Sequence, residues 1–172
     1  MKKLTSGLFY FLFCCTLLAQ PRVGSPAYGL PNSINLNILG DASLVSLNYE
    51  RIFRVQESSF MAGTVGVGYA IDYDDLSFFC DRGCNVREFL SIPHVVTMNI
   101  GIDKYFLEVG LGGTYLYNNS ETFYKLYPVI GYRKRLPGSN KDFRVFIIIP
   151  LSGLAAEPVT VSPIGLSFGR QF

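Results

Sequence analysis

The sequence predicts an all-β protein: an eight-stranded antiparallel up-and-down transmembrane β-barrel that follows a cleaved signal peptide. Three observations support this fold class. Apolar side chains alternate with small or polar ones through most of the chain, as in strands with one apolar face. The chain begins with a segment that has the pattern of an export signal. It ends in an alternating stretch, 164–172, whose last residue is the aromatic Phe172.

The composition agrees with strands that face lipid. The 172 residues include 17 glycines, 11 tyrosines and 14 phenylalanines, whereas only 16% of the residues are charged. A soluble domain of this size normally carries about 25% charged residues. The formal net charge of +2 gives no basic excess of the kind that nucleic-acid binding requires.

Residues 1–19 have the three parts of a signal peptide. Lys2 and Lys3 form the basic end, residues 8–18 form a mostly apolar core, and Ala19 is the small residue at the expected cleavage site. The apolar core is shorter than the roughly 20 residues that a membrane-spanning helix needs. We therefore expect export, cleavage near Ala19 and a bacterial outer-membrane location.

Cleavage there divides the mature chain into a periplasmic lead-in, residues 20–32, and the barrel, residues 33–172. A lipoprotein attached through Cys14 or Cys15 is the alternative. Neither cysteine follows the small residue that lipoprotein processing usually needs, because Phe13 and Cys14 stand in that place. The signal-peptide interpretation is therefore favoured.

Eight segments show the period-two pattern of strands. They are residues 33–39, 44–53, 60–71, 89–100, 105–117, 123–135, 143–151 and 159–172. A tight hairpin turn is expected at 40–42. An even strand number places both termini on the periplasmic side, where the connections 54–58, 101–104 and 137–141 are all short. The longest connection, 72–88, then falls on the extracellular side.

The apolar face of these strands is more consistent than the opposite face. The opposite face carries Gly, Ser, Thr, Asn and scattered charges, so the pattern is inverted relative to an exported soluble β-sandwich, which is the alternative fold. Aromatic residues near strand ends on the apolar face are expected to form girdles at the membrane interfaces. These residues are Phe53, Tyr69, Tyr105, Tyr115 and Tyr117.

Several short motifs carry a family resemblance. In chain order they are Asn48-Tyr49-Glu50-Arg51, Ser91-Ile92-Pro93, Phe106-Leu107-Glu108-Val109-Gly110, Ile130-Gly131-Tyr132-Arg133, Phe143-Arg144 and Gly165-Leu166-Ser167-Phe168-Gly169. In this order and spacing, the chain resembles the small outer membrane protein β-barrel domain family over nearly all of its mature length. The resemblance implies an eight-stranded barrel and no assigned chemistry.

Strand parity places five charged residues inside the predicted barrel: Glu50, Glu108, Lys125, Arg133 and Arg144. Because an isolated buried charge is very costly, we predict that they form a lumenal ion-pair network. Asn35, Asn37, Asn48 and Asn99 fall on the same face and are expected to assist it. Eight strands leave an interior that side chains just fill. The sequence therefore favours a filled lumen over the alternative of a narrow pore for ions or protons.

The long connection carries two cysteines, Cys80 and Cys84, for which we predict a disulfide because exported proteins meet an oxidising compartment. Zinc binding is the alternative, but it would need further ligands. The same connection contains four aspartates and three aromatic residues: Asp72, Asp74, Asp75, Asp81, Tyr73, Phe78 and Phe79. They suggest a surface partner at 72–88, or divalent cations that bridge lipopolysaccharide.

His94, the single histidine, falls on the face predicted to contact lipid. A lipid A deacylase uses a lipid-facing histidine with a nearby serine and an acid, so a lipid-modifying hydrolase is an alternative function. Position 96, where that serine would stand, is Val96, and only Ser91 and Ser167 remain as candidate partners. We therefore expect no catalysis, no cofactor and no metal.

The carboxyl-terminal strand is expected to act as a sorting and assembly signal. Phe168 and Phe172 would be read there by the barrel-assembly machinery. The other expected partners are outer-membrane lipid and lipopolysaccharide, for a monomer with a structural or surface-interaction role. Nothing in the sequence names a specific ligand.

Overall fold

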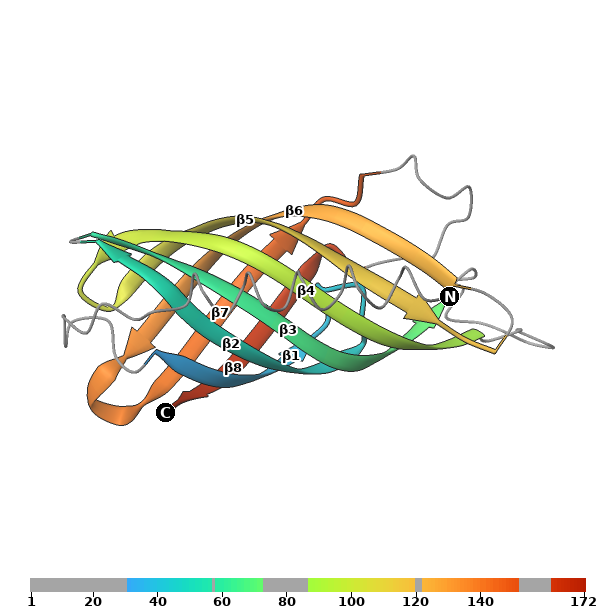
Figure 1. The fold of residues 1–172 in the computed structure, drawn as a ribbon, viewed down its shortest axis with the longest axis horizontal. Helices are drawn as coiled ribbons and strands as arrows, with labels where there is room; N and C mark the ends of the chain where they lie inside the picture. Colours follow the sequence, from blue (N-terminus) through green and yellow to red (C-terminus); the bar gives the residue numbers. More distant parts are fainter. Residues whose placement is uncertain (1–30, 57, 73–86, 120–121, 152–161) are drawn as a thin grey trace, which may run out of the picture.

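The computed structural model describes residues 31–56, 58–72, 87–119, 122–151 and 162–172. They form a closed antiparallel barrel in which each strand pairs with its sequence neighbours and β1 pairs with β8 (Figure 1). The strands are β1 (Asn32–Ile38), β2 (Val45–Gln56), β3 (Ser59–Asp72), β4 (Arg87–Ile102), β5 (Tyr105–Tyr117), β6 (Thr122–Leu136), β7 (Lys141–Ile148) and β8 (Ile164–Gln171). A single 3-10 turn, Pro137–Ser139, accompanies them in the described residues. No helix in these residues is long and apolar enough to cross a membrane.

The predicted eight-stranded antiparallel barrel is confirmed, and most strand bounds agree with the alternation. The range of β5 is the predicted one, whereas β7 ends at Ile148 rather than at residue 151. Pro150 has no N–H to donate to a ladder. The amides of Ile149 and Leu151 still donate to carbonyls of β6, but they do so outside regular pairing. β8 begins at Ile164, and the predicted start at 159 lies outside the described residues.

The barrel has two distinct ends. We call the end where β1 begins and β8 finishes the terminal end, and the opposite one the distal end. At the terminal end β4 and β5 are joined by two residues, Asp103 and Lys104, and β6 joins β7 through residues 137–140. Asp103 and Asn140 adopt positive φ angles of 59° and 53°, which short polar side chains tolerate in tight turns. The two longest connections, residues 73–86 and 149–163, join strands at the distal end.

The barrel is apolar outside and polar inside. Leu47 and Val67 on its outer face are 56% and 58% exposed, whereas Glu50 and Arg133 in the interior are each 1% exposed. The burial pattern of β4 alternates along its length, as period-two strand geometry requires. The described barrel therefore has the inverted arrangement that the sequence predicts.

The predicted tight turn at 40–42 is longer than expected and folds into the barrel. We call residues 39–44 the inner turn; Asp41 within it is only 2% exposed. The hydroxyls of Thr114 and Tyr127 donate to the carbonyl oxygen of Asp41 at 2.6 and 3.4 Å. Gly40 has a φ of +83°, and any side chain there would collide with the backbone of Gly165. Figure 1 shows the connection between β1 and β2 partway along the barrel, short of the tips of β3–β6.

Apolar side chains fill the lumen at three heights. Ile52, Phe60, Ala62 and Phe106 pack together near the terminal end. Ala70, Phe89 and Leu116 pack near the distal end, with Phe123 against them. Between these groups, Ala42 of the inner turn joins Val95, Tyr127, Val129, Phe146 and Ile148. The polar groups of the interior are therefore held between apolar layers.

Candidate functional site

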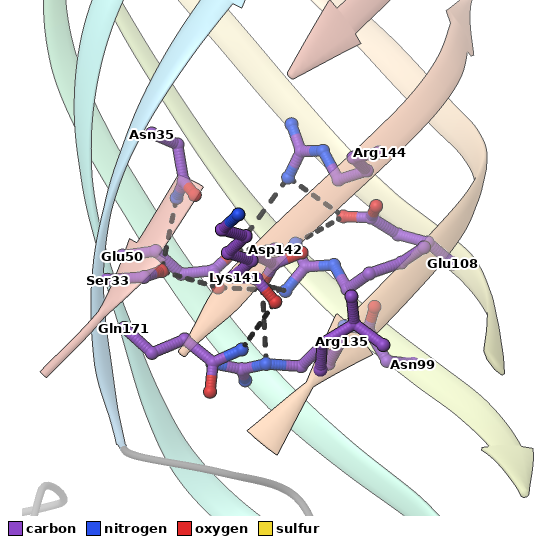
Figure 2. Close-up of polar contacts among 12 residues, drawn as sticks. Ser33, Asn35, Glu50, Asn99, Glu108, Arg135, Lys141, Asp142, Arg144 and Gln171 are labelled. Atoms are coloured by element: carbon purple, nitrogen blue, oxygen red, sulfur yellow. Dashed lines mark hydrogen bonds and ion pairs between the residues drawn. The ribbon is translucent and has the colours of Figure 1, made fainter. Parts of the chain in front are cut away.

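The most distinctive polar feature of the barrel is a buried ionic cluster in the lumen (Figure 2). It contains three acids and three arginines: Glu50 of β2, Glu108 of β5, Arg133 and Arg135 of β6, and Asp142 and Arg144 of β7. Every one of these residues occupies a lumen-facing position of its strand. The formal charges of the cluster balance, which satisfies the requirement that buried charges be paired.

Arg133 lies at the centre of the ionic cluster. Its two terminal nitrogens donate to the two carboxylate oxygens of Glu50 at 2.8 and 2.6 Å. The same guanidinium reaches Glu108 at 3.4 Å and Asp142 at 3.8 Å. The bidentate geometry with Glu50 is the strongest form of an arginine–carboxylate pair. One arginine therefore links carboxylates from three strands across the lumen.

The remaining arginines complete the cluster. Arg144 lies 3.2 Å from Glu108 and 3.8 Å from Glu50, and Arg135 Nε lies 3.3 Å from Asp142. The guanidinium carbons of Arg133 and Arg135 lie 5.7 and 5.4 Å from the ring centre of Phe60. That of Arg144 lies 4.6 Å from the ring centre of Phe146. These contacts allow weakly hydrated guanidinium groups to pack against aromatic rings.

The structure thus brings together four of the five residues predicted to pair, but Lys125 lies elsewhere. Lys125 is on a lumen-facing position of β6, where it pairs in register with Thr114 and is only half-buried. It precedes Arg133 by eight residues, which is about 26 Å along a strand. Lys125 therefore makes its contacts near the distal end, and the parity that identified it gave no information on height.

Sequence reasoning missed Arg135 and Asp142 as members of the cluster. Arg135 shares the parity of Arg133, and Asp142 shares that of Arg144, so the signal was present in the alternation. The alternation predicts a turn at 137–141 and a strand that begins at residue 143, which leaves Asp142 between the two. The structure begins β7 at Lys141, which places the Asp142 carboxylate inside the barrel.

A second polar network surrounds the inner turn. Asn37 Nδ2 and Ser46 Oγ both donate to Asp41 Oδ2, at 2.9 and 2.5 Å. Asn48 Nδ2 donates to Ser46 Oγ at 2.7 Å. Burial raises the pKa of Asp41 above its usual value, although the hydrogen bonds from Ser46 and Asn37 oppose the shift. Two of the asparagines predicted to assist the ion pairs therefore serve the inner turn instead.

The other two asparagines hold local contacts near the ionic cluster. Asn35 Nδ2 donates to Ser33 Oγ at 3.2 Å, and Ser33 Oγ donates to Glu50 at 3.3 Å. Asn99 Nδ2 donates to Thr97 at 3.1 Å. Several buried oxygens, among them Asp41 Oδ1 and Glu108 Oε2, accept no hydrogen bond from the described residues. Such atoms are where a lumenal water would bind.

His94 lies on the outer face, but no hydrolase site surrounds it in the described residues. Its Nε2 is 2.9 Å from the hydroxyl of Tyr124, and the two rings stack with centres 5.6 Å apart. Ser91 and Ser167 are buried in the lumen, on the opposite side of the barrel wall. Because the strand separates them from His94, neither of the two candidate serines can be its nucleophile.

Other predicted features lie partly or wholly outside the described residues. The signal peptide, Cys14, Cys15, Cys80, Cys84 and residues 73–86 all belong to that part of the chain. Phe168 and Phe172 are described, and both are exposed on the outside at the terminal end. Phe168 packs on Phe143 with ring centres 5.2 Å apart, and Phe172 lies 6.4 Å from the ring of Tyr49.

The described lumen-facing residues form no arrangement for metal binding. In the described ranges, no three His, Cys, Asp or Glu side chains lie together in a way that could hold a metal ion. The acids of the ionic cluster instead face arginines.

Comparison with family models, with curated proteins and with solved structures gives no match. The resemblance of the short motifs to the small outer membrane protein β-barrel domain family therefore stays a prediction.

Proposed function

We propose that this chain is an integral outer-membrane β-barrel with a filled lumen, whose role is structural or one of surface interaction. The inverted distribution of side chains supports the proposal most strongly. Aliphatic residues on the outer face, such as Leu47, Val67 and Leu107, are 55–58% exposed, while the charged residues of the ionic cluster are buried. Such a surface is unfavourable in water and favourable in a bilayer.

The height of the apolar outer surface matches a membrane. Tyr105 and Tyr115 are outward residues of β5 that lie ten positions apart, or about 33 Å along the strand. A strand tilt of about 40° reduces this to about 25 Å, the usual height of the apolar band in such barrels. Tyr69, Tyr117 and Tyr124 accompany the distal belt, and Tyr49 and Tyr132 the terminal one. The described outer positions between the belts carry no Asp, Glu, Lys or Arg.

The lumen supports a closed barrel rather than a pore. The inner turn occupies the interior beyond the ionic cluster, and both are backed by apolar layers. On this proposal the terminal end faces the periplasm, and the distal connections face the outside. The barrel then strengthens the membrane or presents its distal connections to a partner. The hydrolase alternative has no supporting observation, because Ser91 and Ser167 face the lumen.

An outward arginine at two depths tests membrane insertion. Val109 lies near the middle of the apolar band, whereas Ile102 pairs in register with Tyr105 of the terminal belt. Val109→Arg should reduce the free energy of unfolding from phospholipid vesicles by about 2–4 kcal/mol, and Ile102→Arg by about 0–1 kcal/mol. Urea titrations of the three proteins measure the difference. Equal, small effects at both depths would contradict the proposal.

A further inference from the structure

The outer face at the terminal end carries an excess of cations. Its described cations are Arg51, Lys104, Lys134, Lys141 and Arg170, and the accompanying described acid is Asp103 in the β4–β5 turn. At the distal end, Glu88 is the charged residue that the described part of the outer face carries. The positive charge is therefore concentrated just beyond one edge of the apolar band.

Two of these cations converge on a pair of stacked tyrosines. The ammonium groups of Lys104 and Lys134 lie 5.3 and 5.6 Å from the ring centre of Tyr105. The ring of Tyr132 stacks on Tyr105 with centres 6.1 Å apart and planes 22° apart. No described acid forms an ion pair with either lysine. The positive charges of these two lysines therefore lie at one aromatic ring, and no described acid pairs with them.

A similar arrangement recurs on β7 and β8. Lys141 and Arg170 are direct register partners on the outer face, and like charges in this position destabilise a sheet. Two residues further along each strand, toward the distal end, the ring of Phe143 packs on that of Phe168. Cations beyond aromatic pairs therefore occur on two separate strand pairs, which suggests a common anionic ligand along this edge.

We infer that Lys104, Lys134, Tyr105 and Tyr132 form a binding site for the phosphate of an anionic phospholipid in the leaflet at the terminal end. The inference rests on the proposed membrane location. Lysine acts as a point charge toward phosphate, and tyrosine hydroxyls at this height donate hydrogen bonds. Leu107, two positions from Tyr105, is 55% exposed and offers the adjoining surface for an acyl chain. A lipid satisfies both the charged and the apolar parts of this surface, whereas a free anion satisfies only the first.

The absence of tryptophan from the chain makes a local test practical. A single Ile102→Trp substitution introduces a fluorophore beside the site, on the register partner of Tyr105, and Tyr117→Trp places one in the distal belt. Each protein is inserted into vesicles of phosphatidylcholine mixed with phosphatidylglycerol, with bromine on the acyl chains of one lipid at a time. Bromine quenches tryptophan fluorescence on contact. The ratio of the quenching by brominated phosphatidylglycerol to that by brominated phosphatidylcholine therefore gives the relative affinity of the site for the anionic lipid. Free phosphate carries no bromine and gives no signal.

Two lysines at a membrane surface favour anionic lipid by about 1 kcal/mol each, which is about a 30-fold preference. We expect this preference at the Ile102→Trp reporter and little at the Tyr117→Trp reporter. Lys104→Gln with Lys134→Gln should remove it, and Lys104→Arg with Lys134→Arg should preserve it. Equal preference at both reporters, or preference that survives the glutamine pair, would overturn the inference while the barrel remains a membrane protein. Absence of quenching by either lipid would overturn the membrane location itself.

Discussion

Replacing Arg133 tests whether the lumen depends on its ionic cluster. The Arg133 guanidinium is 1% exposed and donates two hydrogen bonds to Glu50, at 2.6 and 2.8 Å. Arg133→Met has a similar volume but leaves three buried carboxylates facing two arginines. Of the two arginines that remain, Arg144 reaches a carboxylate oxygen of Glu50 at the longer distance of 3.8 Å. Because breaking a buried pair leaves an uncompensated charge, the free energy of unfolding should fall by about 3–5 kcal/mol.

A double variant separates the effect of the broken ion pair on stability from the effect of the changed side-chain volume. Glu50→Gln combined with Arg133→Met removes both charges, so it should cost clearly less than the sum of the single substitutions. Lys125→Met is a useful comparison, because Lys125 is half-buried and lies away from the cluster, and its loss should be smaller. Urea unfolding from vesicles, followed by tyrosine fluorescence, measures the wild type and the four variants, which include Glu50→Gln alone. A loss under about 1 kcal/mol for Arg133→Met, or additive single effects, would refute the reasoning.

Three further outcomes are expected. Gly40→Val should lower the free energy of unfolding by about 1–3 kcal/mol, because φ is +83° and the side chain meets the backbone of Gly165; an unchanged urea midpoint would contradict this placement of the inner turn. Asp41 has a raised pKa in the folded barrel, so its contribution to stability is greatest in acid and is lost as the pH rises above 3.8 through the folded value. The difference in unfolding free energy between the wild type and Asp41→Asn should follow that direction in a pH series, and a difference independent of pH would contradict it. Cys80 and Cys84 should resist alkylation until they are reduced, which peptide mass spectrometry checks; alkylation without reductant would exclude the predicted disulfide.

The strands were predictable because the period-two pattern is local. Along β5, apolar residues occupy every outward position except Gly113, and the predicted range needed no adjustment. Parity also assigned Glu50, Glu108, Arg133 and Arg144 to the interior, since neighbouring residues of a strand face opposite sides of the barrel wall. Such information suffices to place a residue inside or outside the barrel.

Height and long-range contacts were not predictable from the same pattern. Lys125 has the correct parity but lies about 26 Å from Arg133 along β6, and the residues of other strands that lie at the height of each are known only from the strand register. The sequence of the inner turn resembles that of an ordinary hairpin turn. The residues that contact it in the barrel, Thr114, Tyr127 and Gly165, are distant along the chain and leave no local signal. The pattern therefore does not predict that the Asp41 carboxylate is buried among Asn37, Ser46 and Ser43.

The central claim is that this barrel resides in the outer membrane, and cell fractionation combined with electrophoresis tests it most directly. The full chain is produced in a Gram-negative host, the membranes are washed with alkaline carbonate, and each fraction is run unheated and boiled. The account predicts protein in the washed outer membrane, with a different apparent mass before and after boiling, because a folded barrel resists cold detergent. Protein found in the soluble periplasm, with the same mobility in both lanes, would contradict it.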